Sequence, residues 1–162
     1  MKVFQVTPDV NRYQHLLWDL PSDRLLSAPS FKGEKVSAVW NPPPVHSPKP
    51  LRPVPDIWAV GVGSGGLAFS SDAVDKLDMF LEMAGELLPL RYKSEQLMVL
   101  NILDPLDCLD ESKSEWMALR NGGRSLIKPC IRSDRLVKST LFKSAHNPYK
   151  IFSAEYKWRR GR

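Results

Sequence analysis

Apolar residues recur at helical spacing between positions 71 and 84, and this is the best-defined pattern in the chain. The stripe consists of Ala73, Leu77, Phe80, Leu81 and Ala84. Intervals of three and four residues place such side chains on one face of a helix. Ser70 or Ser71 can accept hydrogen bonds from the free amides of the first turn. Gly85 predicts a left-handed residue that ends the helix, and Pro89 prevents its resumption.

Short apolar runs on both sides of this helix predict strands. They lie at 2–6, 36–40, 57–60, 67–70, 97–103, 126–128, 130–132, 141–143 and 151–152. The run 97–103 is the most apolar, so it should be a central strand that is buried. Residues 86–90 should leave the helix as a buried, extended segment. One main helix at about 71–84 with short, mainly antiparallel strands packed around it predicts an α+β fold.

The 162 residues fit a single domain, 1–162, with a Pro-rich strap at 41–55. The prolines of this strap are Pro42, Pro43, Pro44, Pro48, Pro50, Pro53 and Pro55. Proline at this density excludes a helix or an interior strand and predicts an extended strap over the surface. A docking ligand for a proline-binding module is the alternative interpretation.

Positive charge is concentrated in the segment 124–162, which carries 11 Lys or Arg against two acidic residues, a net charge of +9. The first 123 residues carry 12 basic and 16 acidic residues, a net charge of −4. The basic residues can simply cover the solvent side of strands. Alternatively, they bind nucleic acid, with phosphates on the cations and bases stacked on aromatics. The interleaved aromatic residues are Tyr149, Phe152, Tyr156 and Trp158.

No apolar run approaches the ~20 residues of a membrane span, and the first residues lack the apolar stretch of a signal peptide. We therefore expect a cytoplasmic protein without a membrane partner. The two cysteines, Cys108 and Cys130, fit a reducing compartment.

The sequence predicts no catalytic, cofactor-binding or metal-binding residues. The segment 61–66 satisfies the G-x-G-x-x-G pattern, but residues 67–69 separate it from the helix that should bind a pyrophosphate, so we expect a turn. The three histidines lack the spacing of zinc ligands. Cys108 lies in an acidic segment, which should raise the pKa of its thiol and weaken it as a nucleophile.

The densest acidic set is the best candidate for a partner-binding surface. It contains Asp104, Asp107, Asp110, Glu111 and Glu115. It is either a solvated face, a surface that steers a basic partner, or a metal site, although it lacks the ligand pattern of a calcium loop. The neighbouring Trp116 can anchor an interface or pack in the core. The candidate partner-binding residues are Asp107, Asp110, Glu111 and Trp116.

Several short motifs occur in an order that resembles a known bacterial family. They are Thr7 to Gln14, Trp40 to Pro43, Ser71 to Leu77, Gly85 to Leu90, Leu100 to Ile102, Leu106 to Asp110 with Ser114-Glu115, Leu141 to Lys143, and Ile151-Phe152. Together they cover most of the chain. The family is that of immunity proteins of polymorphic toxin systems, first catalogued as a domain of unknown function.

The resemblance implies an α+β protein without enzymatic activity or cofactor, which binds and neutralises a cognate toxin. Family members usually continue beyond the Ile-Phe strand with a helix and a closing segment. Here Ser153 to Lys157 would begin that helix, and the chain ends at Arg162. The resemblance therefore predicts a truncated or frame-shifted member. The alternative function is nucleic-acid binding by the basic, aromatic segment 124–162.

Overall fold

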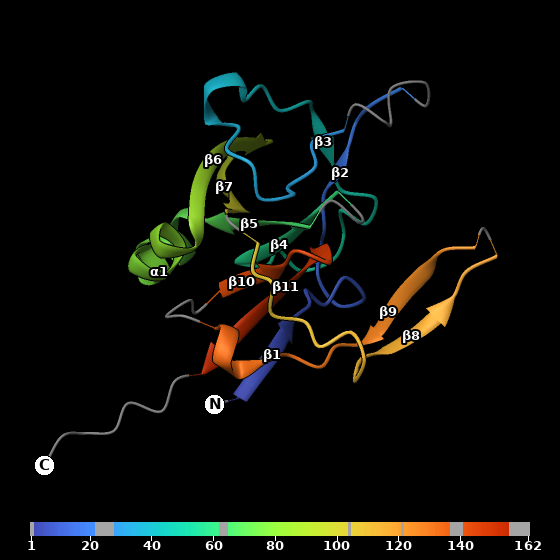
Figure 1. The fold of residues 1–162 in the computed structure, drawn as a ribbon. Helices are drawn as coiled ribbons and strands as arrows, with labels where there is room; N and C mark the ends of the chain where they lie inside the picture. The colour runs from blue at the N-terminus through green and yellow to red at the C-terminus, as the bar shows by residue number, and fades with distance from the viewer. Residues whose placement is uncertain are drawn as a thin grey trace, which may run out of the picture.

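Small antiparallel sheets and one long helix make up the fold of the computed structural model, which describes residues 2–21, 28–61, 65–103, 105–120, 122–136 and 141–155 (Figure 1). The elements in chain order are β1 (Lys2–Val6), β2 (Leu17–Trp18), β3 (Val45–His46), β4 (Ile57–Val60), β5 (Gly66–Ser70), α1 (Ser71–Ala84), β6 (Gly85–Tyr92), β7 (Glu95–Ile102), β8 (Glu115–Ala118), β9 (Arg124–Lys128), β10 (Leu141–Ser144) and β11 (Asn147–Glu155). The predicted α+β class is confirmed, and the helix has the predicted bounds.

The central sheet has the strand order β4-β5-β7-β6, with every pair antiparallel. β7 is hydrogen-bonded on both sides, where Leu100 is opposite Leu67 of β5 and Leu87 of β6. The prediction of a buried central strand at 97–103 is confirmed, since Leu97 to Ile102 are buried except for the half-buried Met98.

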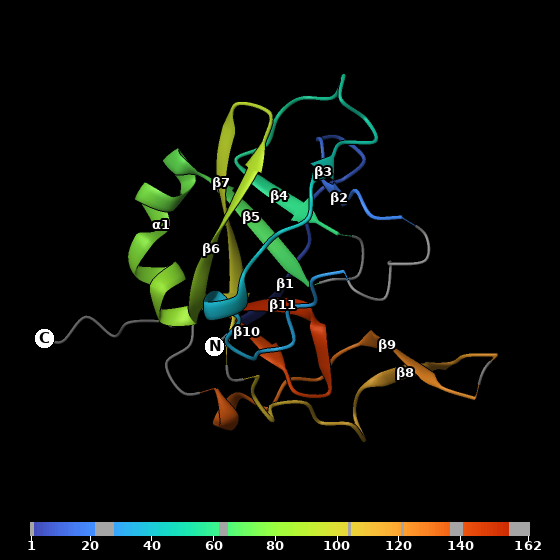
Figure 2. The ribbon, with the colours of Figure 1, turned by 90° about the horizontal axis from the view of Figure 1, so that it is seen from above.

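Both faces of the central sheet are covered by other segments of the chain. A separate hydrophobic core lies on each face. One core joins Trp58, Leu88 and Val99 to Leu16 and Phe31 of the N-terminal segment. The other joins the opposite face to α1 and to the second sheet, in the order β1-β11-β10, through Leu81 and Ile151 among others. α1 thus packs against the central sheet by one face and leaves its other face uncovered at the edge of the molecule (Figure 2).

The ends of α1 are fixed by different kinds of contact. At the start, Ser70 Oγ accepts from Ala73 N at 3.2 Å, as the sequence predicts. At the end, the predicted left-handed glycine is wrong, because Gly85 has an extended backbone with φ 170° and ψ −147°. Gly85 is required by space instead, since a Cβ there would lie 2.0 Å from Asn101 O on β7. The chain passes directly from helix to strand β6, so residues 86–90 are extended as predicted.

Three other local predictions are wrong, and a fourth is met only in part. Residues 36–40 form no strand but contain a 3-10 turn at Ser37–Val39. Phe80, expected in the buried stripe, is 46% exposed. The helix expected to begin at Ser153 is absent over Ser153–Glu155, because these residues pair with β1 at the end of β11. Of the run 130–132, only Ile131 makes a strand-like bridge, to Leu109.

The segment 41–55 crosses the surface as an extended chain and is fastened to the N-terminal segment. β3 within it pairs with β2, and Gln14 Nε2 donates to Pro50 O and Arg52 O at 3.2 and 2.7 Å. The Arg52 guanidinium donates to Val10 O. The strap therefore covers one core without contributing a strand to the central sheet.

Glu86 on β6 joins residues 34–37 of the N-terminal segment to the central sheet. Its carboxylate accepts from Val36 N at 2.6 Å, from Ser37 N at 3.3 Å and from Asn101 Nδ2 at 2.9 Å. Asn101 is fully buried and also donates to Glu34 O. Burial by itself raises the pKa of Glu86, but these hydrogen bonds outweigh it, so the pKa is lowered.

Gly85→Ala should destabilise the fold by about 3 kcal/mol, because the new methyl group collides with rigid backbone of β7. Urea unfolding followed by tryptophan fluorescence measures this. Gly122→Ala is the control: its φ is +80° and its Cβ would have no neighbour within 4 Å. It should cost only about 1 kcal/mol, from left-handed backbone strain. Equal losses in both variants would refute the steric explanation.

Glu86→Gln should lower the free energy of unfolding by about 2 kcal/mol at pH 7, where an ionised carboxylate accepts from three donors. Because the folded-state pKa of Glu86 is depressed, this stability is present above its ordinary value of 4.5 and is lost as pH falls through the folded-state pKa. Urea unfolding at a series of pH values should show the two proteins converging in acid. Glu82→Gln, a substitution at an exposed position, should change the free energy of unfolding at pH 7 by no more than about 0.5 kcal/mol.

Candidate partner-binding site

The predicted acidic residues lie where the chain leaves β7 of the central sheet and enters the β8–β9 hairpin, which projects from the rest of the fold (Figure 1). The structure brings Glu111 and Trp116 together with Arg124 and His146. Asp107 lies at the edge of this group, and Asp110 is hydrogen-bonded within its own turn. Asp104 lies outside the described residues.

Asp110 stabilises its own turn. Its Oδ1 accepts from Ser112 Oγ at 2.7 Å and from Lys113 N at 3.3 Å, and its Oδ2 pairs with Lys113 Nζ at 3.2 Å. The hydrogen bonds from Ser112 and Lys113 lower the pKa of the carboxyl. This arrangement is that of an Asx turn, so Asp110 has a structural explanation that needs no partner.

Glu111 lies between two basic side chains of the same chain. Arg124 pairs with its Oε2, and His146 Nε2 lies 3.0 Å from its Oε1. The Arg124 guanidinium also lies over the Trp116 ring at 4.1 Å, and Trp116 Nε1 donates to Glu111 O at 3.1 Å. This packing leaves Trp116 only half-buried. We call these four residues the hairpin-base cluster; within it, the contact between His146 and Glu111 links the turn between β10 and β11 to the segment before β8.

Asp107 keeps most of its side chain in solvent, with 73% exposed, and its Oδ1 lies 3.8 Å from His146 Nδ1. Glu115 pairs with Lys128 across the hairpin at 3.2 Å. Most of the predicted acidic set thus has a basic neighbour, which reduces the field that it can present to a partner. The four residues remain candidates, but Asp107 is the one that the structure leaves most accessible.

A second acidic surface lies on α1 and was not selected from the sequence. We define the outer face of α1 as Asp72, Asp75, Lys76, Met79, Glu82 and Met83, all of them exposed. The side chains of Met79 and Met83 are 69% and 62% exposed. Among the described residues, none forms an ion pair with the three acidic residues of this face. The sequence does indicate that these residues are exposed, because they lie outside the apolar stripe of the helix.

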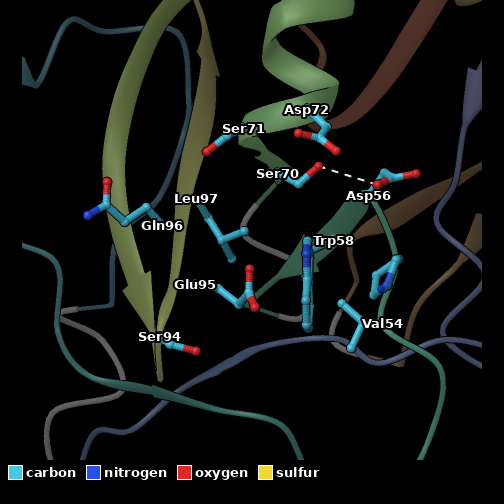
Figure 3. Close-up of a pocket in the computed structure, with 11 residues that line it drawn as sticks. Val54, Asp56, Trp58, Ser70, Ser71, Asp72, Ser94, Glu95, Gln96 and Leu97 are labelled. Carbon is cyan, nitrogen blue, oxygen red and sulfur yellow. Dashed lines mark hydrogen bonds between the residues drawn. The ribbon is translucent and has the colours of Figure 1, made fainter.

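A cavity of about 500 Å³ lies beside the N-terminal end of α1 (Figure 3). It is lined by Val54, Pro55, Asp56, Trp58, Ser70, Ser71, Asp72, Ser94, Glu95, Gln96 and Leu97. Ser70 Oγ lies 3.4 Å from Asp56 Oδ1, and Ser70 N donates to Asp56 O at 2.9 Å. These bonds tie the start of α1 to the chain just before β4. Ser70, the N-cap residue of α1, therefore also holds Asp56 in place at one side of the cavity.

The described basic residues of the C-terminal segment all have partners in the chain. Arg124 and Lys128 pair across the hairpin, and Arg132 and Arg135 both approach Asp134. Lys150 Nζ donates to Leu126 O at 2.9 Å. The fully buried Lys143 donates to Phe31 O, and burial lowers the pKa of its ammonium group to about 8. The other basic residues of 124–162 lie outside the described part.

The remaining candidate chemistry has structural explanations in the part of the chain that is described. Gly61 and Gly65 have φ values of 58° and 70°, as a turn requires, whereas residues 62–64 lie outside the description. No described group of three or more His, Cys, Asp and Glu could hold a metal ion. No described helix is long and apolar enough to cross a membrane.

Cys108 is fully buried, and burial raises the pKa of its thiol to about 11, with a smaller contribution from the charge of Asp107. The predicted direction is confirmed, although burial is the main cause. We predict that a thiol reagent at pH 8 modifies Cys130 in the native protein and Cys108 only after unfolding. Absorbance of the released thiolate should show one prompt equivalent, which Cys130→Ser abolishes. A second prompt equivalent would contradict the buried position of Cys108.

No protein-family model, curated protein or solved structure matches the chain. Membership of the immunity-protein family therefore stays a prediction that rests on the order of the sequence motifs. The functional argument has to start from the surfaces of this chain.

Proposed function

We propose that this chain is a non-enzymatic, cytoplasmic immunity protein that binds a cognate toxin and neutralises it by occlusion. The sequence motifs supply the class of function. The observation that carries the proposal on the structural side is the outer face of α1, where accessible carboxylates surround exposed methionines. A surface of this composition suits a protein partner with a basic, partly apolar binding site.

The charge on this face favours a basic partner. It carries three carboxylates and one ammonium group, and no described residue elsewhere in the chain pairs with the carboxylates. Unpaired surface charges of one sign accelerate encounter with a partner of the opposite sign and disfavour other partners. The hairpin-base cluster lacks this property, because Glu111 is already paired with Arg124.

The apolar part of the face supplies the contact that would hold the complex together. Met79 and Met83 are one turn apart and accessible, and Phe80 beside them is 46% exposed. Thioether side chains adapt their shape to a partner, and burying them removes apolar surface from water at about 25 cal/mol per Å². The acidic residues would steer the toxin, and the methionines would limit its dissociation.

Nucleic-acid binding remains the alternative function, and no structural observation favours it. Each described basic residue of the segment 124–162 contacts a carboxylate or a carbonyl of the chain. Binding to phosphates would require several of these contacts to be exchanged. It would also weaken steeply as salt is added, which makes it easy to recognise.

Co-expression with the toxin domain encoded beside the gene should rescue growth, and the two proteins should co-purify. In the same assay Asp75→Lys should weaken the complex at least about tenfold, because a like charge then faces the basic toxin. Asp107→Lys is the matched control, an exposed charge reversal on the hairpin side, and should change binding by less than about threefold.

The ranking of the two surfaces is tested by the same pair of variants. A larger loss with Asp107→Lys would return the binding site to the hairpin-base cluster. Failure of the soluble, folded wild-type chain to rescue growth or bind the toxin would remove the immunity function. Salt-sensitive binding to single-stranded DNA would then support the alternative.

A further inference from the structure

We propose that the cavity at the N-terminal end of α1 binds an arginine or lysine side chain of a protein partner, together with a neighbouring backbone carbonyl. The inference deepens the proposed function, on which it rests for the identity of the partner. The chemistry of the cavity is argued from its own residues and can be tested without the toxin.

Three carboxylates line the cavity and make it a site for a cation. They come from separate elements: Asp56 precedes β4, Asp72 belongs to the first turn of α1, and Glu95 begins β7. No lining residue is basic, and within the described part of the chain none of the three carboxylates forms an ion pair. The fold thus places three carboxylates, each with one formal negative charge, around this cavity.

The helix N-terminus in the same cavity does not reverse this preference. Its dipole corresponds to roughly half a positive charge, and Ser70 Oγ already accepts from one of the first amides. Three carboxylates exceed that half charge several-fold. An anionic ligand would be repelled, whereas a guanidinium or ammonium group would gain up to three acceptors.

The indole of Trp58 adds a second requirement. Trp58 is 1% exposed, and its Nε1 has no hydrogen-bond partner among the described residues. Figure 3 shows the indole nitrogen directed toward the side of the cavity where Ser70 and Asp56 lie. An indole N–H is a donor only, so it calls for an acceptor, and a buried donor without one is costly. A small cation alone has no acceptor to offer.

A basic residue within a polypeptide meets both requirements at once. Its cationic head can face the carboxylates while a carbonyl of its own backbone accepts from Trp58. The cavity volume of about 500 Å³ lies within the range of roughly 300–1,000 Å³ that holds small ligands. Asp72 belongs both to the cavity and to the outer face of α1, so one partner could occupy the two together.

The test uses the whole ¹⁵N-labelled chain and N-acetyl-arginine methylamide as the probe. The indole N–H signal of Trp58, a residue whose ring centroid lies 5.6 Å from that of Tyr92, can be assigned with the Trp58→Phe variant; it should shift and saturate with a dissociation constant on the order of millimolar. N-acetyl-citrulline methylamide, which is neutral and similar in shape, should cause no saturable shift. Methylguanidinium, which lacks the carbonyl, should bind more weakly and leave the indole signal in place.

Variants assign the binding to this cavity. Glu95→Gln and Asp56→Asn should each weaken probe binding about threefold to fivefold at low salt, whereas Asp78→Asn, at an exposed residue of α1 outside both the cavity and the outer face, should not. Equal binding of the citrulline compound, an indole shift with methylguanidinium alone, or no shift with the arginine compound would each overturn the proposal. If the chain rescues growth from the toxin but does not bind the probe, only this inference is refuted. If it binds the probe but does not rescue growth, only the immunity function is refuted.

Discussion

The burial of β7 on both faces is the constraint on which the rest of the structure depends. A strand with cores on both sides must be covered twice, by α1 and the second sheet on one face and by the N-terminal segment with its Pro-rich strap on the other. From Leu97 to Ile102, β7 is largely buried, and a polar residue in this part must find partners inside the protein. The side-chain nitrogen of Asn101 does so by donating to Glu86 and to Glu34 O, while its Oδ1 has no hydrogen-bond partner among the described residues. Asn101 and Glu86 therefore determine where residues 34–37 of the N-terminal segment attach to the sheet.

The junction at Gly85 connects this constraint to the surface that we propose for binding. Because Gly85 lies against the backbone of Asn101, helix α1 must pass into β6 without a loop, and its rotation about its own axis is thereby restricted. Ser70 and Asp56 restrict the other end in the same way. With both ends held, α1 turns Ala73, Leu81 and Ala84 to the sheet and the residues of its outer face to solvent. The exposed methionines are thus a consequence of how the helix is anchored at its two ends.

The sequence predicts the elements whose pattern is local and misses those that depend on distant contacts. The bounds of α1, the burial of 97–103 and the strands 2–6 and 57–60 follow from periodicity and capping residues, and the structure confirms them. Residues 36–40 have the composition of a strand, but Glu86, fifty residues away, binds the amides of Val36 and Ser37 and a 3-10 turn forms instead. Ser153–Glu155 form a strand because β1 offers them a partner from the other end of the chain. The cavity at α1 combines three distant segments, and no local pattern could reveal it.

An acidic residue that forms an ion pair within the chain is less available to a partner. Which acidic residues are paired depends on the fold and cannot be read from their density in the sequence. The sequence shows a dense acidic set at 104–115 and a looser one on α1, and density alone favours the first. In the structure, a hairpin brings Arg124 to Glu111 and Lys128 to Glu115, so that much of the denser set is neutralised from within the chain. The carboxylates of α1 and of the adjoining cavity have no such neighbours among the described residues. A cation that approaches the molecule therefore meets a net negative charge at α1, beside the apolar side chains that could hold it there.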